Sequence, residues 1–167
     1  MPSSSAPSAT SATSVIEGRW EQEHTCQQLV DALDAAGLAA LAPGVVGDYF
    51  PDRTPQQLAR KANVCSGAQP QRHAHFFTSD GAFGSLDQHG QQVDDGPYEV
   101  SGDTLTIAEG EFHYSVDGDT LVLEPVIREA DRQSALADPL EFSTAGWQVS
   151  VAYDGLAFTR VPCDGWC

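Results

Sequence analysis

Basic residues are scarce in this chain of 167 residues: eight Lys and Arg stand against 24 Asp and Glu, which gives a net charge of −16. A surface so acidic repels phosphate backbones and anionic lipid headgroups. No run of apolar residues approaches the length needed to cross a bilayer. We therefore expect neither nucleic acid partners nor membrane insertion. With 41% apolar and 19% charged residues, the chain is expected to fold as one domain with its own core.

The N-terminal segment lacks the features of a signal peptide. Residues 1–15 carry no charge, so they have neither the basic region nor the apolar segment that a signal peptide requires. Ser, Ala, Thr and Pro dominate this stretch, which predicts a flexible tail.

The four cysteines form no Cys-x-x-Cys motif and no zinc-ribbon spacing, so a structural zinc site is not expected. A local disulfide between Cys163 and Cys167 is sterically possible around Gly165. A second bond, between Cys26 and Cys65, would close a long loop. An even cysteine count in an acidic chain with a single lysine favours an oxidising compartment, extracellular or at the cell surface. Four reduced, buried thiols are the alternative.

Hydrophobic periodicity changes twice along the chain. Weak alternation over 20–26 predicts a first strand, and helical spacing of Leu and Val over 27–42 predicts an amphipathic helix. Thr54, Pro55 and Gln57 are typical of an N-cap, a first helical position and a capping box, which predicts a short helix to about Ala62. A helical turn is expected within 128–139. Further strands are predicted at 72–78, 82–88, 97–100, 103–107, 111–116, 120–126, 147–153 and 156–161.

Asp-Gly and Gly-Asp turns separate these short strands, which is typical of a meander in an up-and-down barrel or a sandwich. Closure removes exposed strand edges, so we expect a mainly β fold: a barrel of about 8–10 strands with a two-helix insert at 27–62. A barrel of this size can hold one small ligand. The expected segments are the tail 1–15, the barrel 16–162 and a C-terminal tail 163–167.

Gly18-Arg19-Trp20 at the start of the first strand resembles the Gly-x-Trp signature of lipocalins and the wider calycin group. Arg160, in the last predicted strand, resembles the arginine that packs across that tryptophan as a cation–π lid. The segments HFFTSDGAFGSLDQHG and DDGPYEVSGDTL are similar to uncharacterised secreted lipocalin-like proteins of actinobacteria. The Thr-Asp-Tyr loop of true lipocalins is missing, and the helical insert is more like the lid of fatty-acid-binding proteins. The resemblance implies transport or sequestration of a small apolar molecule, with Trp20 and Arg160 closing the barrel.

Two histidines, His73 and His75, share one face of a predicted strand. One interpretation, which the sequence favours, places them on the outer face while Ala74 and Phe76 point inward. In the other, His24 joins them inside the barrel, where three imidazoles are the number that catalytic zinc uses. Alternation does not decide between the two interpretations.

A third candidate, His113, alternates with Phe112 and Tyr114 and is expected to face outward together with Glu111. In a polar lumen this assignment would reverse, and Glu111 and His113 would form an acid–base pair. His89, in a hairpin turn, is expected to be solvated. Acidic turns at 94–96 and 117–119 lack the spacing of a calcium loop, so neither a metal nor a cofactor is predicted.

Aromatic and aliphatic residues of the later strands are expected to share one face, where they either line a ligand cavity or fill a solid core. The residues predicted to bind ligand are Tyr98, Phe112, Tyr114, Leu123, Trp147 and Tyr153.

Three functions are compatible with these patterns. The first is a binding protein that encloses a small apolar or aromatic molecule. The second is an enzyme, of cyclase or isomerase type, that uses His73, His75 or His113 as acid or base. The third is an extracellular inhibitor or interaction module. We rank the three functions in this order by analogy with proteins of similar fold.

Overall fold

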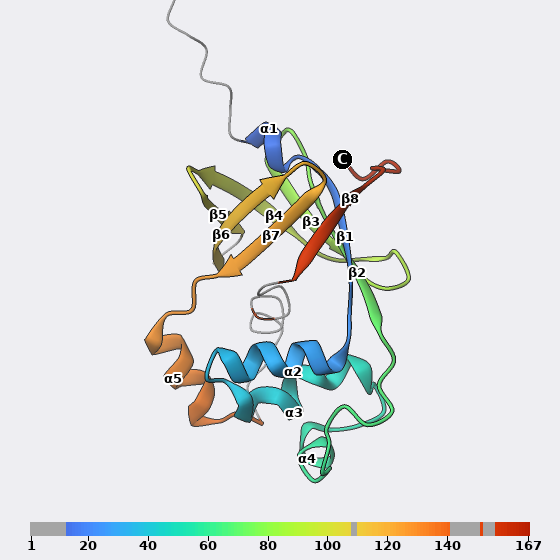
Figure 1. Cartoon of the computed structure of the whole chain (residues 1–167), viewed down its shortest axis with the longest axis vertical. Coiled ribbons are helices and arrows are strands. Elements are labelled where there is room, and N and C mark those ends of the chain that lie inside the picture. Colours follow the sequence, from blue (N-terminus) through green and yellow to red (C-terminus); the bar gives the residue numbers. More distant parts are fainter. Residues whose placement is uncertain (1–12, 108–109, 141–150, 152–155) are drawn as a thin grey trace, which may run out of the picture.

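The predicted meander forms a closed barrel in the computed structural model, which describes residues 13–107, 110–140, 151 and 156–167. Each antiparallel strand pairs with the next along the chain, and the last returns to the first (Figure 1). The expected strand at 147–153 lies outside the described residues except for Val151. The strands are β1 (Gly18–His24), β2 (Gln71–Phe77), β3 (Ala82–Leu86), β4 (Gln92–Ser101), β5 (Thr104–Ile107), β6 (Gly110–Asp117), β7 (Thr120–Pro125) and β8 (Ala157–Val161).

Most predicted strands lie close to the observed ones, but the expected acidic turn at 94–96 is wrong. Asp94 and Asp95 belong to β4, which begins at Gln92 and pairs with β3 through an irregularity between Ser85 and Leu86.

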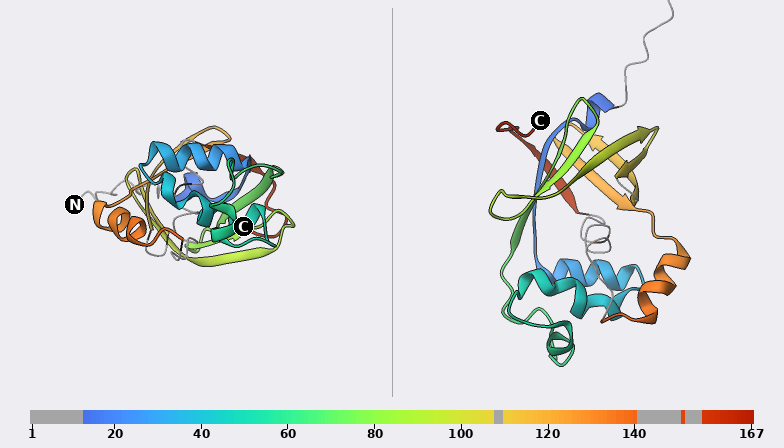
Figure 2. Two further views of the ribbon diagram at one scale, coloured as in Figure 1. Left: turned by 90° about the horizontal axis from the view of Figure 1, so that it is seen from below. Right: turned by 180° about the vertical axis from the view of Figure 1, so that it is seen from behind.

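The helical segments between Cys26 and Tyr49 lie across one end of the barrel, whereas α1 lies at the other end (Figures 1 and 2). Apolar residues of the helical segments and of the strands belong to a single core cluster. The helices therefore pack against that end of the barrel and close it. We call residues 26–49 the helical cap. The helical segments are α1 (Thr13–Ile16), α2 (Cys26–Ala35), η1 (Ala39–Leu41), α3 (Ala42–Val45), η2 (Val46–Tyr49), α4 (Pro55–Leu58) and α5 (Glu129–Ala137).

The expectation of one continuous helix over 27–42 is wrong. Gly37 adopts a φ of 72°, and the backbone amides of Gly37 and Leu38 donate to the carbonyls of Asp34 and Leu33. This pair of bonds is the Schellman motif, which ends a helix. The chain therefore turns back as short segments over the barrel end.

The second predicted helix begins as expected and ends early. Thr54 accepts from the Gln57 amide, and the Gln57 side chain accepts from the Thr54 amide, which forms the predicted capping box. The helix ends at Leu58 rather than Ala62. Beyond it, the Asn63 side chain accepts from the amide of Cys65 in a turn that precedes the disulfide.

Trp20 lies at the end of the barrel where α1 lies. Its side chain is fully buried, and its indole nitrogen donates to the Ile16 carbonyl at 2.8 Å. Arg160, its cross-strand neighbour on β8, places its Cζ 4.0 Å from the centre of the indole. The same guanidinium donates to the carbonyls of Glu17 and Val15. One arginine therefore covers the tryptophan and fixes the chain that leads into β1.

Gly18 is needed beside this arginine. Its φ of 128° is one that L side chains rarely adopt, and an added Cβ would lie 2.6 Å from the Nη1 of Arg160. We expect Gly18→Ala to lower the free energy of unfolding by about 2 kcal/mol. Gly47→Ala is the matched control, because a Cβ there meets nothing within 4 Å, and it should change stability by less than about 0.5 kcal/mol. Urea unfolding of both variants tests this; equal losses would contradict it.

Both predicted disulfides are present. Cys26–Cys65 joins the first residue of α2 to the segment before β2, across a sequence separation of 39 residues, and Cys163–Cys167 closes a separation of 4. Two disulfides fit an oxidising environment. Within the described residues, no helix is both long and apolar enough to span a bilayer.

The two bonds should differ in their effect on stability. Replacing Cys26 and Cys65 together by Ala should cost about 4 kcal/mol in the chain-entropy model, because the loop they close is long. The same change at Cys163 and Cys167 should cost about 2 kcal/mol. Guanidinium unfolding of the two double variants measures the difference, and a larger loss from the C-terminal pair would overturn this ranking.

Candidate functional site

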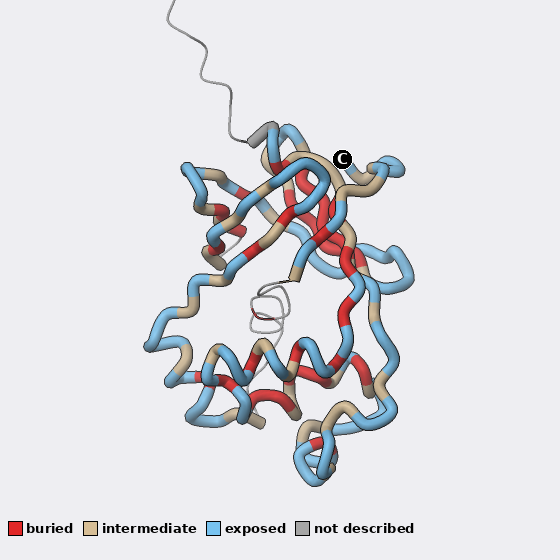
Figure 3. Tube along the Cα trace, in the orientation of Figure 1, coloured by how far each residue is buried: buried red, intermediate tan, exposed pale blue. Residues whose placement is uncertain are grey.

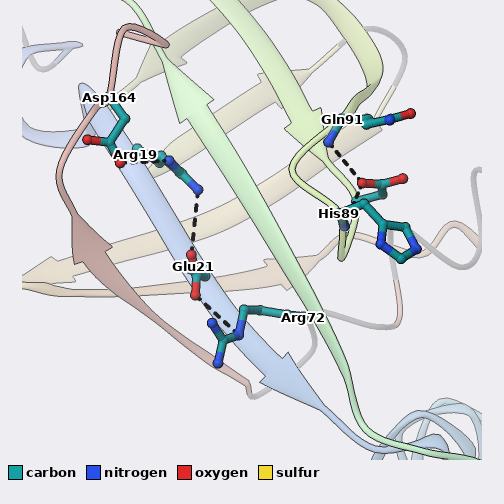
Figure 4. Close-up of polar contacts among 7 residues, drawn as sticks. Arg19, Glu21, Arg72, His89, Gln91 and Asp164 are labelled. Carbon is teal, nitrogen blue, oxygen red and sulfur yellow. Dashed lines mark hydrogen bonds and ion pairs between the residues drawn. The ribbon is translucent and has the colours of Figure 1, made fainter.

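Ion pairs identify the outer face of β1. Arg19 lies 3.6 Å from Glu21 and 3.3 Å from Asp164, and Glu21 lies 3.4 Å from Arg72 on β2 (Figure 4). Alternate residues of a strand point to opposite faces. The side chains between these charges therefore point into the barrel.

Strand register gathers polar side chains on the inner face of β1, β2 and β3. Trp20 pairs with His75, Gln22 pairs with His73, and His75 pairs in turn with Ser85. His24 follows on β1, next to the helical cap. We call this group the interior polar row; it consists of Gln22, His24, His73, His75 and Ser85.

The favoured outward placement of His73 and His75 is wrong. His75 is completely buried, and its ring lies 4.9 Å from that of Phe83 and 5.1 Å from that of Phe158, both core residues. His73 is half-buried, with its ring 4.7 Å from that of His75.

Ala74 and Phe76 instead form a second apolar cluster with Leu86, apart from the main core, and Trp166 covers it. The Phe76 and Trp166 rings lie 5.4 Å apart. The Phe76 ring also occupies the space that a Cβ on Gly84 would need. Burial of Ala74 and Phe76 therefore does not place them in the interior.

The interior polar row holds nearly all the buried polarity of the described chain. Figure 3 colours the buried residues red, and among those of the described chain only four are polar by residue type: Gln22, His24, His75 and Ser85. These four lie on neighbouring strands and alternate with outward-facing residues. Their clustering distinguishes this part of the interior from the rest of the core.

At the helical cap, two contacts join the cap to the strands. The His24 Nδ1 lies 2.5 Å from the Tyr49 hydroxyl, and the Gln71 side chain donates to the carbonyl of Asp48 at 2.9 Å. Burial raises the pKa of Tyr49, and the charge of Asp48 adds to this shift. Tyr49 therefore remains a neutral hydroxyl beside His24.

Deeper in the barrel, the Ser85 Oγ lies 3.0 Å from the His75 Nδ1. Both side chains are almost completely buried. No carboxylate is buried among the described residues. Ser85 and His75 therefore form a hydrogen-bonded pair of neutral groups.

Gln22 stands apart from the rest of the row. Gln22 is only 5% exposed. Neither its Oε1 nor its Nε2 has a hydrogen-bond partner within the part of the chain that the structure describes. An amide buried without partners costs about 1–3 kcal/mol. Such groups are rare in proteins and call for a structural or functional explanation.

Burial keeps the histidines of the row neutral. It lowers the pKa of His73 to about 4, with a further contribution from His24 and an opposing one from Asp87. It also lowers the pKa of His24, against Asp48, and holds the pKa of His75 well below its usual range. At neutral pH the row therefore offers hydrogen-bonding groups without charge.

The predicted ligand-binding residues lie on other strands. Phe112 and Leu123 are buried in the main core. The Tyr98 hydroxyl donates to the Thr78 carbonyl at 2.8 Å, and the Tyr114 hydroxyl donates to the Gly102 carbonyl at 3.2 Å. Both hydroxyls therefore already bond to backbone near hairpin turns. Trp147 and Tyr153 lie outside the described residues.

His113 is exposed on β6, as the alternation predicts, and it lies away from the interior polar row. His89 is exposed in the turn between β3 and β4, where Asp87 accepts from the amides of His89 and Gln91 (Figure 4). His24, His73 and His75 share the interior, yet no group of three or more His, Cys, Asp or Glu in the described segments is arranged to hold a metal ion.

Sequence reasoning missed Gln22 and Ser85. The alternation that places Trp20 inside also places Gln22 inside, so the signal for Gln22 was present. Ser85 had none, because its position depends on the register of β2 with β3. No protein-family model, no curated protein and no solved structure matches the chain.

The lowered pKa of His73 predicts acid sensitivity. Between about pH 6.5 and pH 4 the unfolded chain binds a proton at this residue that the folded chain does not, so the free energy of unfolding falls as the pH falls. His73→Gln should remove on the order of 2 kcal/mol of this fall. His89→Gln, in the exposed turn, is the control and should retain the wild-type profile. Urea unfolding across this range measures the effect; identical profiles for both variants would refute it.

Proposed function

We propose that this protein is a calycin-like barrel that binds a small, largely apolar molecule between Trp20 and the helical cap. Three features support the proposal: closure of the barrel, the Arg160 guanidinium over Trp20, and the helices across the opposite end. The Gly18-x-Trp20 geometry supports a relationship to lipocalins. The two disulfides support an extracellular or cell-surface location.

The observation that carries this proposal is the clustering of buried polar groups in an otherwise apolar interior. A binding site typically combines apolar walls with a few convergent polar groups. The interior polar row supplies such groups, and aromatic rings of Phe77, Phe83 and Phe158 lie near His75. A core selected for stability alone would have little use for an unpartnered amide at Gln22.

An enzyme acting in the same interior is the second candidate, and the contact between Ser85 and His75 favours it. The pKa of His73, at about 4, makes it a weak base at neutral pH. His75 is completely enclosed by its neighbours. Binding therefore has more support than catalysis.

The binding proposal predicts uptake of a neutral apolar dye. N-phenyl-1-naphthylamine, whose fluorescence rises in apolar surroundings, should bind the full chain saturably at one site. His73→Trp should weaken this binding about tenfold or more by placing a larger ring in the proposed site. His113→Trp makes the same change on the outer surface and should bind as the wild type does.

Fluorescence titration with excitation beyond the tryptophan band gives the dissociation constants, and near-UV circular dichroism confirms that each variant is folded. Absence of saturable binding to the wild-type chain would contradict the proposal. Equal affinity of the two folded tryptophan variants would also contradict it.

A further inference from the structure

The Gln22 side chain points into the barrel from β1. Both polar atoms of its amide are buried, and neither meets a hydrogen-bond partner among the described residues. It follows Trp20 on the inner face of β1, precedes His24, and pairs across the sheet with His73. A terminal amide offers donors from its nitrogen and an acceptor at its oxygen, side by side.

Charge restricts what this amide can receive. In the described segments no Asp, Glu, Lys or Arg is buried, so the interior has no enclosed counter-charge for an anion or a cation. The histidines beside Gln22 are neutral at neutral pH because burial lowers their pKa values. The chain as a whole, at a net charge of −16, repels anions at long range. A charged group bound here would lose its hydration without gaining a counter-charge.

The side chains around Gln22 indicate the rest of the ligand. Trp20 lies one inward position away on β1, and the His73 ring stacks edge-on against His75 at 4.7 Å. Beyond His75 lie the Phe83 and Phe158 rings. Aromatic surroundings of this kind favour a flat, apolar body.

We infer that the ligand is an uncharged molecule with a flat apolar body and a carboxamide-like edge, in which a hydrogen-bond donor stands next to an acceptor. The Gln22 side chain forms hydrogen bonds with this edge. Primary amides, lactams and imides have such an edge. The inference rests on the proposed binding function and adds the chemical class of the ligand and the residue that selects it.

Three probes with one naphthalene body separate the contributions: 2-naphthamide carries the donor–acceptor edge, 2-methylnaphthalene has only the apolar body, and 2-naphthoate carries a charge. Competition with N-phenyl-1-naphthylamine on the full chain gives their affinities. We expect 2-naphthamide to bind about tenfold more tightly than 2-methylnaphthalene, since the amide satisfies buried groups that the methyl leaves unpaired. We expect 2-naphthoate to bind most weakly.

Gln22→Met keeps the length of the side chain and removes its hydrogen-bonding atoms. This variant should bind 2-methylnaphthalene as the wild type does and lose the roughly tenfold preference for 2-naphthamide. Its free energy of unfolding should be equal to or higher than that of the wild type, because an unpartnered amide gives way to an apolar group. Gln92→Met, at an exposed position of β4, is the control and should keep the preference.

Each other outcome overturns the inference. A preference for 2-naphthamide that survives in Gln22→Met would assign recognition to another residue. A loss of stability or a failure to fold in Gln22→Met would show that the amide has a structural role. Tightest binding of 2-naphthoate would refute the uncharged class. Failure of 2-methylnaphthalene to bind the wild type would overturn the proposed function as well, whereas binding without any preference would overturn this inference alone.

Discussion

Pairing of β1 with both β2 and β8 closes the barrel, and the contact of Arg160 with Trp20 lies at that closure. Once Trp20 is inside and Arg19 is paired with Asp164 outside, the two faces of β1 are assigned. Because side chains alternate along a strand, Gln22 must then point inward. The polarity of the interior is thus a consequence of how the barrel closes.

That polarity opposes stability, and the binding proposal rests on it. The buried histidines lower the free energy of unfolding as the pH falls. The Gln22 amide loses its hydrogen bonds to water and gains none from the described residues. The chain compensates elsewhere, with a continuous apolar core from barrel to cap and with the Cys26–Cys65 bond, which ties the start of the cap to the segment before β2. Departures from good core chemistry of this kind are expected at functional sites. The helical cap encloses this part of the barrel, and the contact of Tyr49 with His24 joins the two.

Local patterns predicted much of the fold. Asp-Gly turns and alternation indicated the meander, Thr54 and Gln57 indicated a helix start, and cysteine positions indicated both disulfides. The faces of His73 and Ala74 could not be predicted, because both sides of β2 are buried and alternation is then uninformative. Trp166, far along the chain, covers the outer side. The register of β1 with β2, a long-range property, decides which side holds the histidines.

The location of a bound molecule tests the central claim most directly. Isotope-filtered nuclear Overhauser spectra of the labelled protein with unlabelled N-phenyl-1-naphthylamine report which side chains lie next to the dye. The interior site predicts contacts from the dye to the Gln22 side chain and to the His73 ring. Contacts confined to Phe76 and Trp166 would place the dye on the outer cluster and contradict the account.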